Sequence, residues 1–405
     1  MSDDFPILAQ KINGHQFVYL DSAATSMRPA YVLDRIDAFY KSSAANPHRG
    51  VYALAERATA AYEGARASVA RFVGVDADEI VFTRNASESL NLVMYCYAAL
   101  RLGPGDSIVI PISEHHSNLV TWQIAAAKTG AELRYLYVDA QTGYIPDGEI
   151  EKKIDKTTKI VAFAHVSNVL GALFPVEKLV SRARDAGAIT VLDAAQSVPH
   201  LPVDLKGLGV DFAAFSAHKM YGPMGIGVLY GRRALLEEMP PFLYGGDMIE
   251  YVREQDTDFA APPHKFEAGT QNAGGAVGLA AAIEYIDSVG WERIEANEAA
   301  LMRRLIKGLG DLRHMSIIGD ADPDARRYGV ASFNIDDVHS HDAATILDSY
   351  GIAIRAGAHC AHPLLDYLGV KASCRASLGL YTTERDVDAL LECIPLVRRK
   401  LGYGD

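Results

Sequence analysis

Short apolar runs rich in β-branched residues alternate along this chain with longer amphipathic runs, and this alternation limits the possible folds. The short runs are typical of strands buried on both faces, and the amphipathic runs are typical of helices covering a sheet. The order predicts an α/β fold with a mostly parallel, seven-stranded sheet. The expected strands are 80–83, 107–111, 133–138, 160–165, 189–193, 212–216 and 227–230, and the expected helices include 54–72, 87–100, 118–129 and 176–186.

The rhythm changes after about residue 280, where a long helical run at 291–309 is followed by strands and helices in an α+β order. A chain of 405 residues is too long for one small core and suits two or three domains. We therefore expect an N-terminal arm at 1–15 packing on the small domain, a large domain at 16–280 and a smaller C-terminal domain at 281–405. The segments 240–246 and 256–265 are predicted to be long loops.

Composition excludes several classes of protein. With 51 acidic against 39 basic residues, the net charge of −12 argues against nucleic acid or an anionic membrane as the main partner. No apolar stretch approaches the ~20 residues that span a bilayer, and the first ten residues lack the pattern of a targeting peptide. The four cysteines (Cys96, Cys360, Cys374 and Cys393) form no CxxC pair, so we expect no zinc ribbon and a reducing, cytoplasmic setting.

Two side chains at expected strand ends indicate an aldehyde cofactor. Lys219 follows the strand 212–216, and a lysine there can form an imine with such a cofactor. Ser216 and His218 beside it are suited to bind a phosphate. Asp193 ends the strand 189–193 and can pair with a protonated pyridine nitrogen, while Gln196 can donate to a ring hydroxyl. Taken singly, Lys219 could be a surface lysine and Asp193 a helix cap.

The segments after two further strands add to this prediction. His115 could stack on an aromatic cofactor, or start a helix. A metal pair with His116 is disfavoured because adjacent helical histidines do not face one metal; no metal site is expected. Ala86 and Ser87 open a helix, whose free N–H groups and the Ser87 hydroxyl make a phosphate cradle. Neither a dinucleotide nor an NTP motif occurs.

The second domain supplies a candidate nucleophile. Cys360 lies in a Gly/Ala-rich loop between His359 and His362, where nearby cations or a helix end would favour the reactive thiolate. A lone cysteine is more often a buried core residue, which we expect of Cys96, Cys374 and Cys393. Arg375 could grip a substrate carboxylate with two hydrogen bonds.

Together these residues resemble the group II, SUF-type branch of the cysteine desulfurases, in the class V aminotransferase family. The similarity runs through nearly the whole chain. It is carried by the motifs at 19–24, 48–50, 114–116, 165–171, 193–196, 218–223, 266–270 and 355–363. No single motif is specific, but their order and spacing are. The resemblance implies a fold-type-I, PLP-dependent transferase. Such an enzyme would convert L-cysteine into alanine and a persulfide, which supplies sulfur for iron–sulfur cluster assembly.

The resemblance also implies a role for each matching residue. Lys219 would carry pyridoxal 5'-phosphate as a Schiff base and move protons, and Cys360 would accept the sulfur. The other implied cofactor contacts are Asp193 with the ring nitrogen, Gln196 with the ring oxygen, His115 stacked on the ring, Asn168 nearby, and Ala86, Ser87, Ser216 and His218 with the phosphate. Thr270 would reach the phosphate of the neighbouring subunit of a homodimer. Arg375, Asn168 and Arg355 would bind the substrate.

Three positions bear on how far the resemblance extends. The phosphate loop has Asn85-Ala86-Ser87 where relatives commonly have Gly-Thr-Thr, so altered phosphate contacts are expected. Ala358 stands where relatives often have a histidine, which removes one polar neighbour of Cys360. His341 matches a histidine found in relatives that pass sulfur to a zinc-containing scaffold-like acceptor. A zinc-containing or SufE-like acceptor is therefore expected, although His341 could equally be a polar helix-start residue.

Other activities are compatible with the same fold and site residues. A selenocysteine lyase or a cysteine sulfinate desulfinase could be a side activity of this site. A small-substrate aminotransferase would not need Cys360. A binding protein that has lost catalysis is disfavoured because Lys219, Asp193 and Arg375 are all present.

Overall fold

The computed structural model describes residues 2–403; Met1 and residues 404–405, at the outer ends of the predicted arm and small domain, lie outside the described residues. Its largest element is a seven-stranded sheet in the order β4-β10-β9-β8-β7-β5-β6, with only β10 antiparallel to its neighbours. The strands are β4 (Ile80–Thr83), β5 (Ser107–Pro111), β6 (Glu132–Leu136), β7 (Thr158–Ala164), β8 (Ile189–Asp193), β9 (Phe212–Ser216) and β10 (Gly227–Gly231). The predicted mostly parallel sheet is confirmed.

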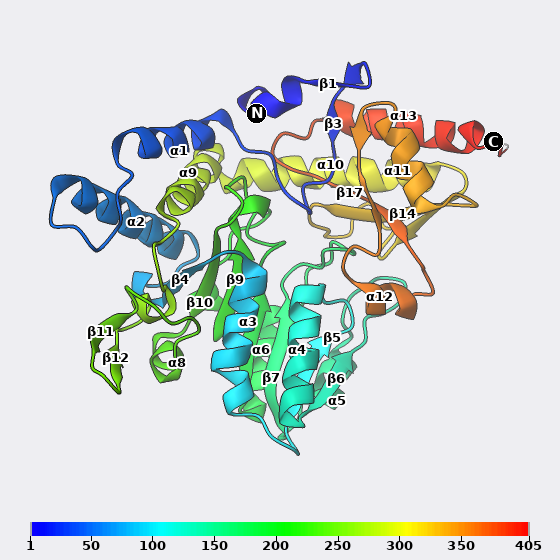
Figure 1. Ribbon diagram of the computed structural model, residues 1–405. Helices are drawn as coiled ribbons and strands as arrows, with labels where there is room; N and C mark the ends of the chain where they lie inside the picture. The colour runs from blue at the N-terminus through cyan, green and yellow to red at the C-terminus, as the bar shows by residue number, and fades with distance from the viewer. Residues whose placement is uncertain (1, 404–405) are drawn as a thin grey trace.

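Helices cover both faces of this sheet, which explains why its strands are apolar on both sides. Alternate residues point to opposite faces: Ile108 and Ile110 pack in one core, and Val109 packs in the other. Figure 1 shows α3 and α4 on one face and α6 behind the sheet. The helices of this domain are α1 (Ala30–Ser42), α2 (Ala53–Phe72), α3 (Ala86–Cys96), α4 (His116–Thr129), α5 (Asp147–Lys153), α6 (Val176–Ala186), α7 (Leu205–Leu208), α8 (Arg233–Glu238) and α9 (Ala273–Val289).

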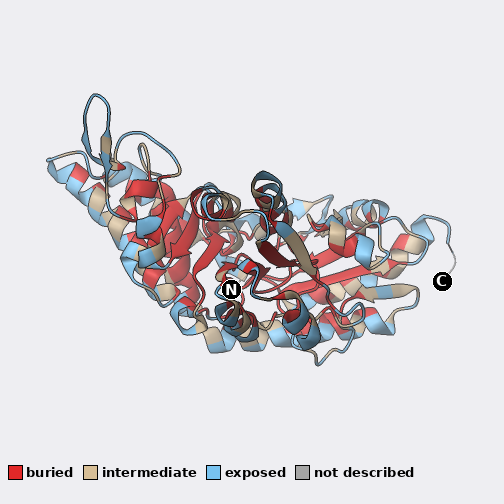
Figure 2. Cartoon of the chain, turned by 90° about the horizontal axis from the view of Figure 1, so that it is seen from below, coloured by how far each residue is buried: buried red, intermediate tan, exposed pale blue. Residues whose placement is uncertain are grey.

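The C-terminal part has its own α+β core. Its antiparallel sheet has the order β13-β14-β17-β16. The elements are α10 (Trp291–Asp311), β13 (Met315–Ile318), β14 (Val330–Ile335), α11 (Ser340–Asp348), β15 (Ile352–Ala353), β16 (Arg355–Gly357), α12 (His362–Tyr367), β17 (Ser373–Ser377) and α13 (Glu384–Lys400). Buried residues follow the strands and the inner helix faces, while the outer faces are exposed (Figure 2).

The N-terminal segment contacts both parts of the molecule. Its hairpin of β1 (Lys11–Ile12) and β2 (His15–Gln16) is followed by β3 (Val18–Tyr19), which pairs in parallel with β15. Asn13 donates to the Asp348 carbonyl at 2.7 Å, whereas Phe5 packs edge-on against Tyr381 and Tyr285 in the large core. The predicted domain boundary between 280 and 281 falls inside α9, and residues of this helix on both sides of it belong to the large core.

One predicted loop contains regular structure. The segment 256–265 includes β12 (Thr257–Phe259), which pairs with β11 (Ile249–Val252) in a hairpin, and the 3-10 turn His264–Phe266 begins at its end. The hairpin was missed because its strands are only four and three residues long and are mostly exposed, so no extended buried run marks them in the sequence. Among the helices of the described residues, none combines the length and apolar character needed to cross a bilayer.

Candidate active site

A pocket of about 200 Å³ opens where the carboxyl ends of the parallel strands meet the small domain. In open α/β sheets this edge is the usual place for ligands. The predicted site residues that line it are Ala86, Ser87, His115, Asn168, Asp193, Gln196, Ser216, His218, Lys219, Arg355 and Arg375. Residues from six strand ends or following loops, far apart in the sequence, are therefore gathered around one cavity.

Lys219 and Asp193 face each other across this pocket. Lys219 ends the 3-10 turn Ala217–Lys219 that follows β9, and Asp193 ends the adjacent β8. Burial lowers the pKa of Lys219 to about 8, an effect that Asp193 opposes and Arg375 and Arg355 reinforce. Burial also raises the pKa of Asp193, although Lys219 opposes that shift. About a tenth of Lys219 is thus the neutral amine at pH 7, far more than for a lysine of ordinary pKa, and the neutral amine is the form that a nucleophile or base requires.

The phosphate-binding group predicted from sequence lies at one end of the pocket. Asn85 caps α3 by accepting from the Glu88 N–H at 3.0 Å, so the helix begins at Ala86. The Ala86 N–H donates to Ser216 Oγ at 2.8 Å, and the Ser87 and Ser117 hydroxyls are 2.5 Å apart. Hydroxyl groups thus cluster at a helix N-terminus, which attracts an anion. Asn85 has a capping role that the motif comparison did not predict.

His115 lies inside the pocket and His116 outside it. Burial, with Lys219 as the next cause, lowers the pKa of His115 to about 3, so the ring is neutral. Its Nδ1 accepts from the Ser117 N–H at 3.1 Å, which fixes the ring at the start of α4. His116 instead stacks on His362, with ring centroids 5.0 Å apart. The two adjacent histidines therefore point to different places.

A buried carboxyl, Glu114, supports this strand end and was not assigned a role from sequence. It accepts from Asn118 Nδ2 at 2.6 Å and from the Ala164 N–H at 2.9 Å. Burial raises its pKa to about 8. Glu114 thus ties the His115 segment to the end of β7.

Arg375 is buried at the junction of the two domains. Its Nη1 donates to the Asn168 carbonyl at 3.0 Å and its Nη2 to Asp21 at 3.2 Å, while Nε has no partner among residues 2–403. Burial lowers its pKa to about 10, so it stays cationic at neutral pH. The Asp21 contact was missed from sequence because its partner lies 354 residues away. An unpaired donor on a buried cation, beside the cavity, can bind a carboxylate.

Cys360 lies on a loop beside this pocket rather than in its lining. Both His359 and Cys360 have positive φ, 50° and 58°, a costly conformation for side-chain-bearing residues. Two hydrogen bonds from the large domain hold the loop: Asn168 Nδ2 donates to the His359 carbonyl at 2.7 Å, and the His116 N–H to the Cys360 carbonyl at 2.8 Å. Arg355 Nη2, from the pocket, lies 3.7 Å from Cys360 Sγ.

Thr270 is the one predicted contact that lies apart from the Lys219 pocket. It is exposed and lines a separate hollow with Tyr62, Glu88 and Asn272. Of the other cysteines, Cys96 and Cys374 are buried, whereas Cys393 is only half-buried.

The pocket residues fit pyridoxal phosphate. An amine of low pKa, a buried carboxylate and a neutral flat imidazole line one cavity that ends in a helix N-terminus. Gln196 donates to the Ala23 carbonyl at 2.9 Å, and its buried Oε1 has no partner within the described residues. A buried polar atom without a partner is expected where a ligand group binds.

Comparisons with known proteins agree with this geometry. Residues 18–390 match the family model described as aminotransferase class-V. The chain is 46% identical to a probable cysteine desulfurase of Halalkalibacterium halodurans, covering 98% of this chain and 97% of that protein. It is 45% identical to a cysteine desulfurase of Haloferax volcanii, covering 98% and 95%. The crystal structure of a cysteine desulfurase from Escherichia coli superimposes with a TM-score of 0.90 at 38% identity, covering 98% of each chain.

Proposed function

The chain belongs to the class-V aminotransferase family and is a pyridoxal-phosphate-dependent cysteine desulfurase, and we propose that Cys360 accepts the sulfur taken from L-cysteine. The observation that carries this assignment is the position of Arg355. Its side chain lines the Lys219 pocket and its Nη2 reaches Cys360 Sγ at 3.7 Å, so a substrate in the pocket has the thiol within reach.

The residues that would hold the cofactor can be grouped by the part of it that they contact: the phosphate, the aldehyde carbon or the ring. Ser87, Ser216, His218 and the free N–H groups of the helix turn that begins at Ala86 would bind the phosphate, and Lys219 would bind the aldehyde carbon. Asp193 would hold a proton on the ring nitrogen, Gln196 would contact the ring oxygen, and His115 would lie against the ring face. Bound pyridoxal phosphate supplies an electron sink that stabilises negative charge on the substrate carbon next to the amino group.

Lys219 and Arg375 would prepare the substrate. Arg375 and Asn168 bind its carboxylate, which fixes the orientation of the carbon that bears the amino group. The neutral form of Lys219 Nζ, which is accessible because burial lowers the pKa of the amine to about 8, removes the proton from that carbon. The same amine, once protonated, returns a proton to the product.

Cys360 would then complete the sulfur transfer. Its thiolate attacks the substrate sulfur, and the new S–S bond forms as the bond from the substrate Cβ to sulfur breaks. The electron pair of the broken bond stays on carbon and is protonated, so L-alanine leaves and a persulfide remains on Cys360. Arg355 stabilises negative charge on the attacking sulfur because its guanidinium lies against it.

The deciding experiment compares the wild type with Cys360→Ala. With L-cysteine and a thiol reductant, the wild type should release equal amounts of alanine and sulfide. Cys360→Ala should lose both while binding the cofactor with unchanged visible absorbance. Equal alanine production by the two proteins would remove Cys360 from the reaction, and an aminotransferase acting on other amino donors would then be the better assignment.

We also propose a homodimer that shares its active sites. Thr270 is exposed and lies apart from the Lys219 pocket of its own chain, as expected of a residue that serves the other subunit. Large apolar side chains are also exposed on α1 and on the loop that follows it, where Tyr40 is 60% and Val51 fully accessible, and such patches mark interfaces. Light scattering should give twice the mass of one chain; a monomer with full activity would contradict sharing.

The persulfide would pass to a sulfur-acceptor protein, either zinc-containing or SufE-like, in a SUF-type route to iron–sulfur clusters. His341 is exposed at the start of α11, and its Nε2 lies 3.8 Å from where a side chain at Gly357 would begin, on the strand that leads to Cys360. His341→Ala should keep basal turnover and lose stimulation by a zinc-containing acceptor. Equal stimulation of both proteins would exclude a role for His341.

A reducing, cytoplasmic setting and a selenocysteine lyase side activity complete the proposal. All four cysteines are free thiols, which is typical of proteins from reducing compartments. Selenocysteine differs from the substrate at one atom, and the attack of Cys360 on selenium would follow the same geometry.

A further inference from the structure

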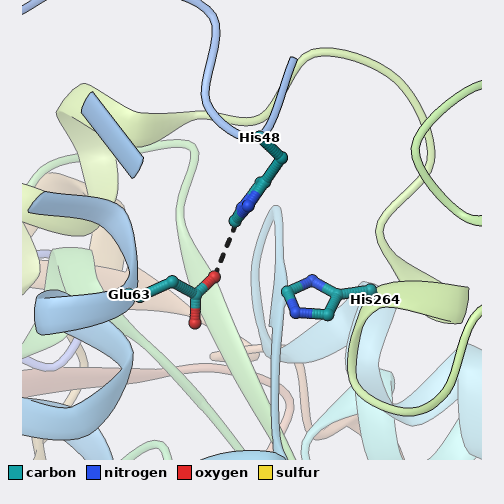
Figure 3. Close-up of side chains that lie close together, drawn as sticks. All are labelled: His48, Glu63 and His264. Atoms are coloured by element: carbon teal, nitrogen blue, oxygen red, sulfur yellow. Dashed lines mark ion pairs between the residues drawn. The ribbon is translucent and has the colours of Figure 1, made fainter. Parts of the chain in front are cut away.

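Two histidines and a glutamate converge on the surface of the large domain, outside the Lys219 pocket. His48 lies on the loop between α1 and α2, Glu63 lies on α2, and His264 starts the 3-10 turn before α9. One ligand atom from each of the three side chains lies within 4.8 Å of the other two. Figure 3 shows the rings and the carboxylate pointing toward a common centre.

Glu63 is held in place by a buried arginine. Arg66 Nε donates to Glu63 Oε2 at 2.9 Å, and Arg66 Nη2 to Oε1 at 3.2 Å. His48 Nε2 lies 3.3 Å from the same Oε1. A carboxylate oxygen accepts more than one contact, so Oε1 can bind a cation while Arg66 fixes its direction. Metal-binding carboxylates are commonly oriented by such an outer partner.

The charges around Glu63 do not balance without a cation. Arg66 also pairs with Glu267 at 2.7 Å, and Tyr62 and the Phe82 N–H donate to that second carboxylate. One guanidinium thus serves two carboxylates, which leaves one negative charge among these groups. The excess charge lies at Glu63, on the side where the two histidines approach.

The positions of His48 and His264 suit both side chains to act as metal ligands. The His48 N–H donates to Thr59 Oγ1 at 2.8 Å, which ties the loop to α2 although His48 has a φ of 66°. The His264 ring meets His48 edge-on, and across residues 2–403 its nitrogens take no hydrogen bond. The ring nitrogens of His264 are therefore available to a ligand.

From this arrangement we propose that His48, Glu63 and His264 form a binding site for Zn²⁺ or a similar borderline divalent cation. Two imidazole nitrogens and one carboxylate oxygen suit zinc, whereas Mg²⁺ prefers oxygen ligands alone. Three protein ligands leave a fourth position for water. The ion would clamp the His48 loop, α2 and the segment that leads to Thr270. This proposal is independent of the desulfurase reaction.

The test is a zinc competition experiment on the full-length, cofactor-loaded protein. Its thiols are first alkylated, bound metal is removed with a chelator, and Zn²⁺ is titrated against a chromogenic chelator. The wild type should bind one tight equivalent more than His264→Ala or Glu63→Gln. In each variant, the affinity of this site for Zn²⁺ should fall by more than the roughly 10–100-fold that is lost when an outer partner of a metal ligand is removed. Mg²⁺ at equal concentration should not displace the zinc.

The matched control uses a second histidine in the left-handed region. His48 and His314 have φ of 66° and 62°, and each lies beside a carboxylate. Asparagine tolerates this backbone conformation, so His48→Asn and His314→Asn should fold equally well, as melting curves can verify. Only His48→Asn should lose the tight zinc. Equal zinc binding by wild type, His48→Asn, Glu63→Gln and His264→Ala would overturn the site and leave only a His48–Glu63 ion pair.

Discussion

The Lys219 pocket and the Cys360 loop are built differently, although both belong to the active site that we propose. The pocket is formed by the ends of buried strands, and its polar groups are fixed by helix caps and burial. The loop belongs to the other domain, has two residues in the left-handed region, and is held by hydrogen bonds from the large domain. In the proposed reaction, proton transfer would thus occur in the pocket built from strand ends, and sulfur transfer at a segment with strained backbone.

The substitution Lys219→Ala should distinguish the function of the pocket from that of the Cys360 loop most clearly. Loss of the amine should lower alanine formation by more than about 10³-fold, because it removes the only general base assigned to the pocket. The rate at which an alkylating reagent labels Cys360 should stay within about twofold of wild type. A large fall in labelling would show that the loop depends on Lys219 and that the two regions are not independent.

The pH dependence of pyridoxal phosphate uptake is the second test of the difference between the pocket and the Cys360 loop. A folded-state pKa near 8, below the ordinary value, means that neutral Lys219 is lost as pH falls through 8. In the cofactor-free protein, the rate of pyridoxal phosphate uptake should therefore fall about tenfold for each pH unit below that value. Stopped-flow absorbance measures this rate. A profile that keeps rising to the ordinary lysine range would show that burial does not tune the amine.

Arg355→Ala tests the contact that joins the two regions. Removing a half-buried guanidinium 3.7 Å from Cys360 Sγ should slow alkylation of the thiol by up to about fivefold, the size expected of a pair worth 1 kcal/mol or less. Arg355→Lys should restore part of the rate because it keeps the charge. The same labelling rate in all three proteins would mean that Arg355 acts only on the substrate.

The smallest effect is expected from His362→Ala. His362 Nδ1 lies 3.1 Å from His116 Nε2, and the exposed pair supports one side of the Cys360 loop. Since a typical exposed hydrogen bond contributes about 1 kcal/mol or less, sulfide release should fall a few-fold, with cofactor affinity unchanged. A change in cofactor affinity measured by equilibrium titration would extend the influence of this pair into the pocket.

Much of the fold follows from local sequence. The strands at 80–83, 107–111, 189–193 and 212–216 have the predicted bounds because each is a short, mostly apolar run rich in β-branched or aromatic residues. The β11–β12 hairpin was missed, since its strands are only four and three residues long and are mostly exposed. Local sequence also placed Asp193 and Lys219 at strand ends, and parallel strands bring such ends to one edge.

By itself, the sequence determined the class of fold, the family and many of the residues that line the pocket, because these depend on local patterns and ordered motifs. Only the tertiary structure decided which groups meet across long separations: Asp21 with Arg375, Arg355 with Cys360, and His48 with Glu63 and His264. Such contacts depend on how two domains and several loops pack. Packing fixes the burial and the neighbours that set the pKa of Lys219, and neither can be obtained from a residue's position in the chain.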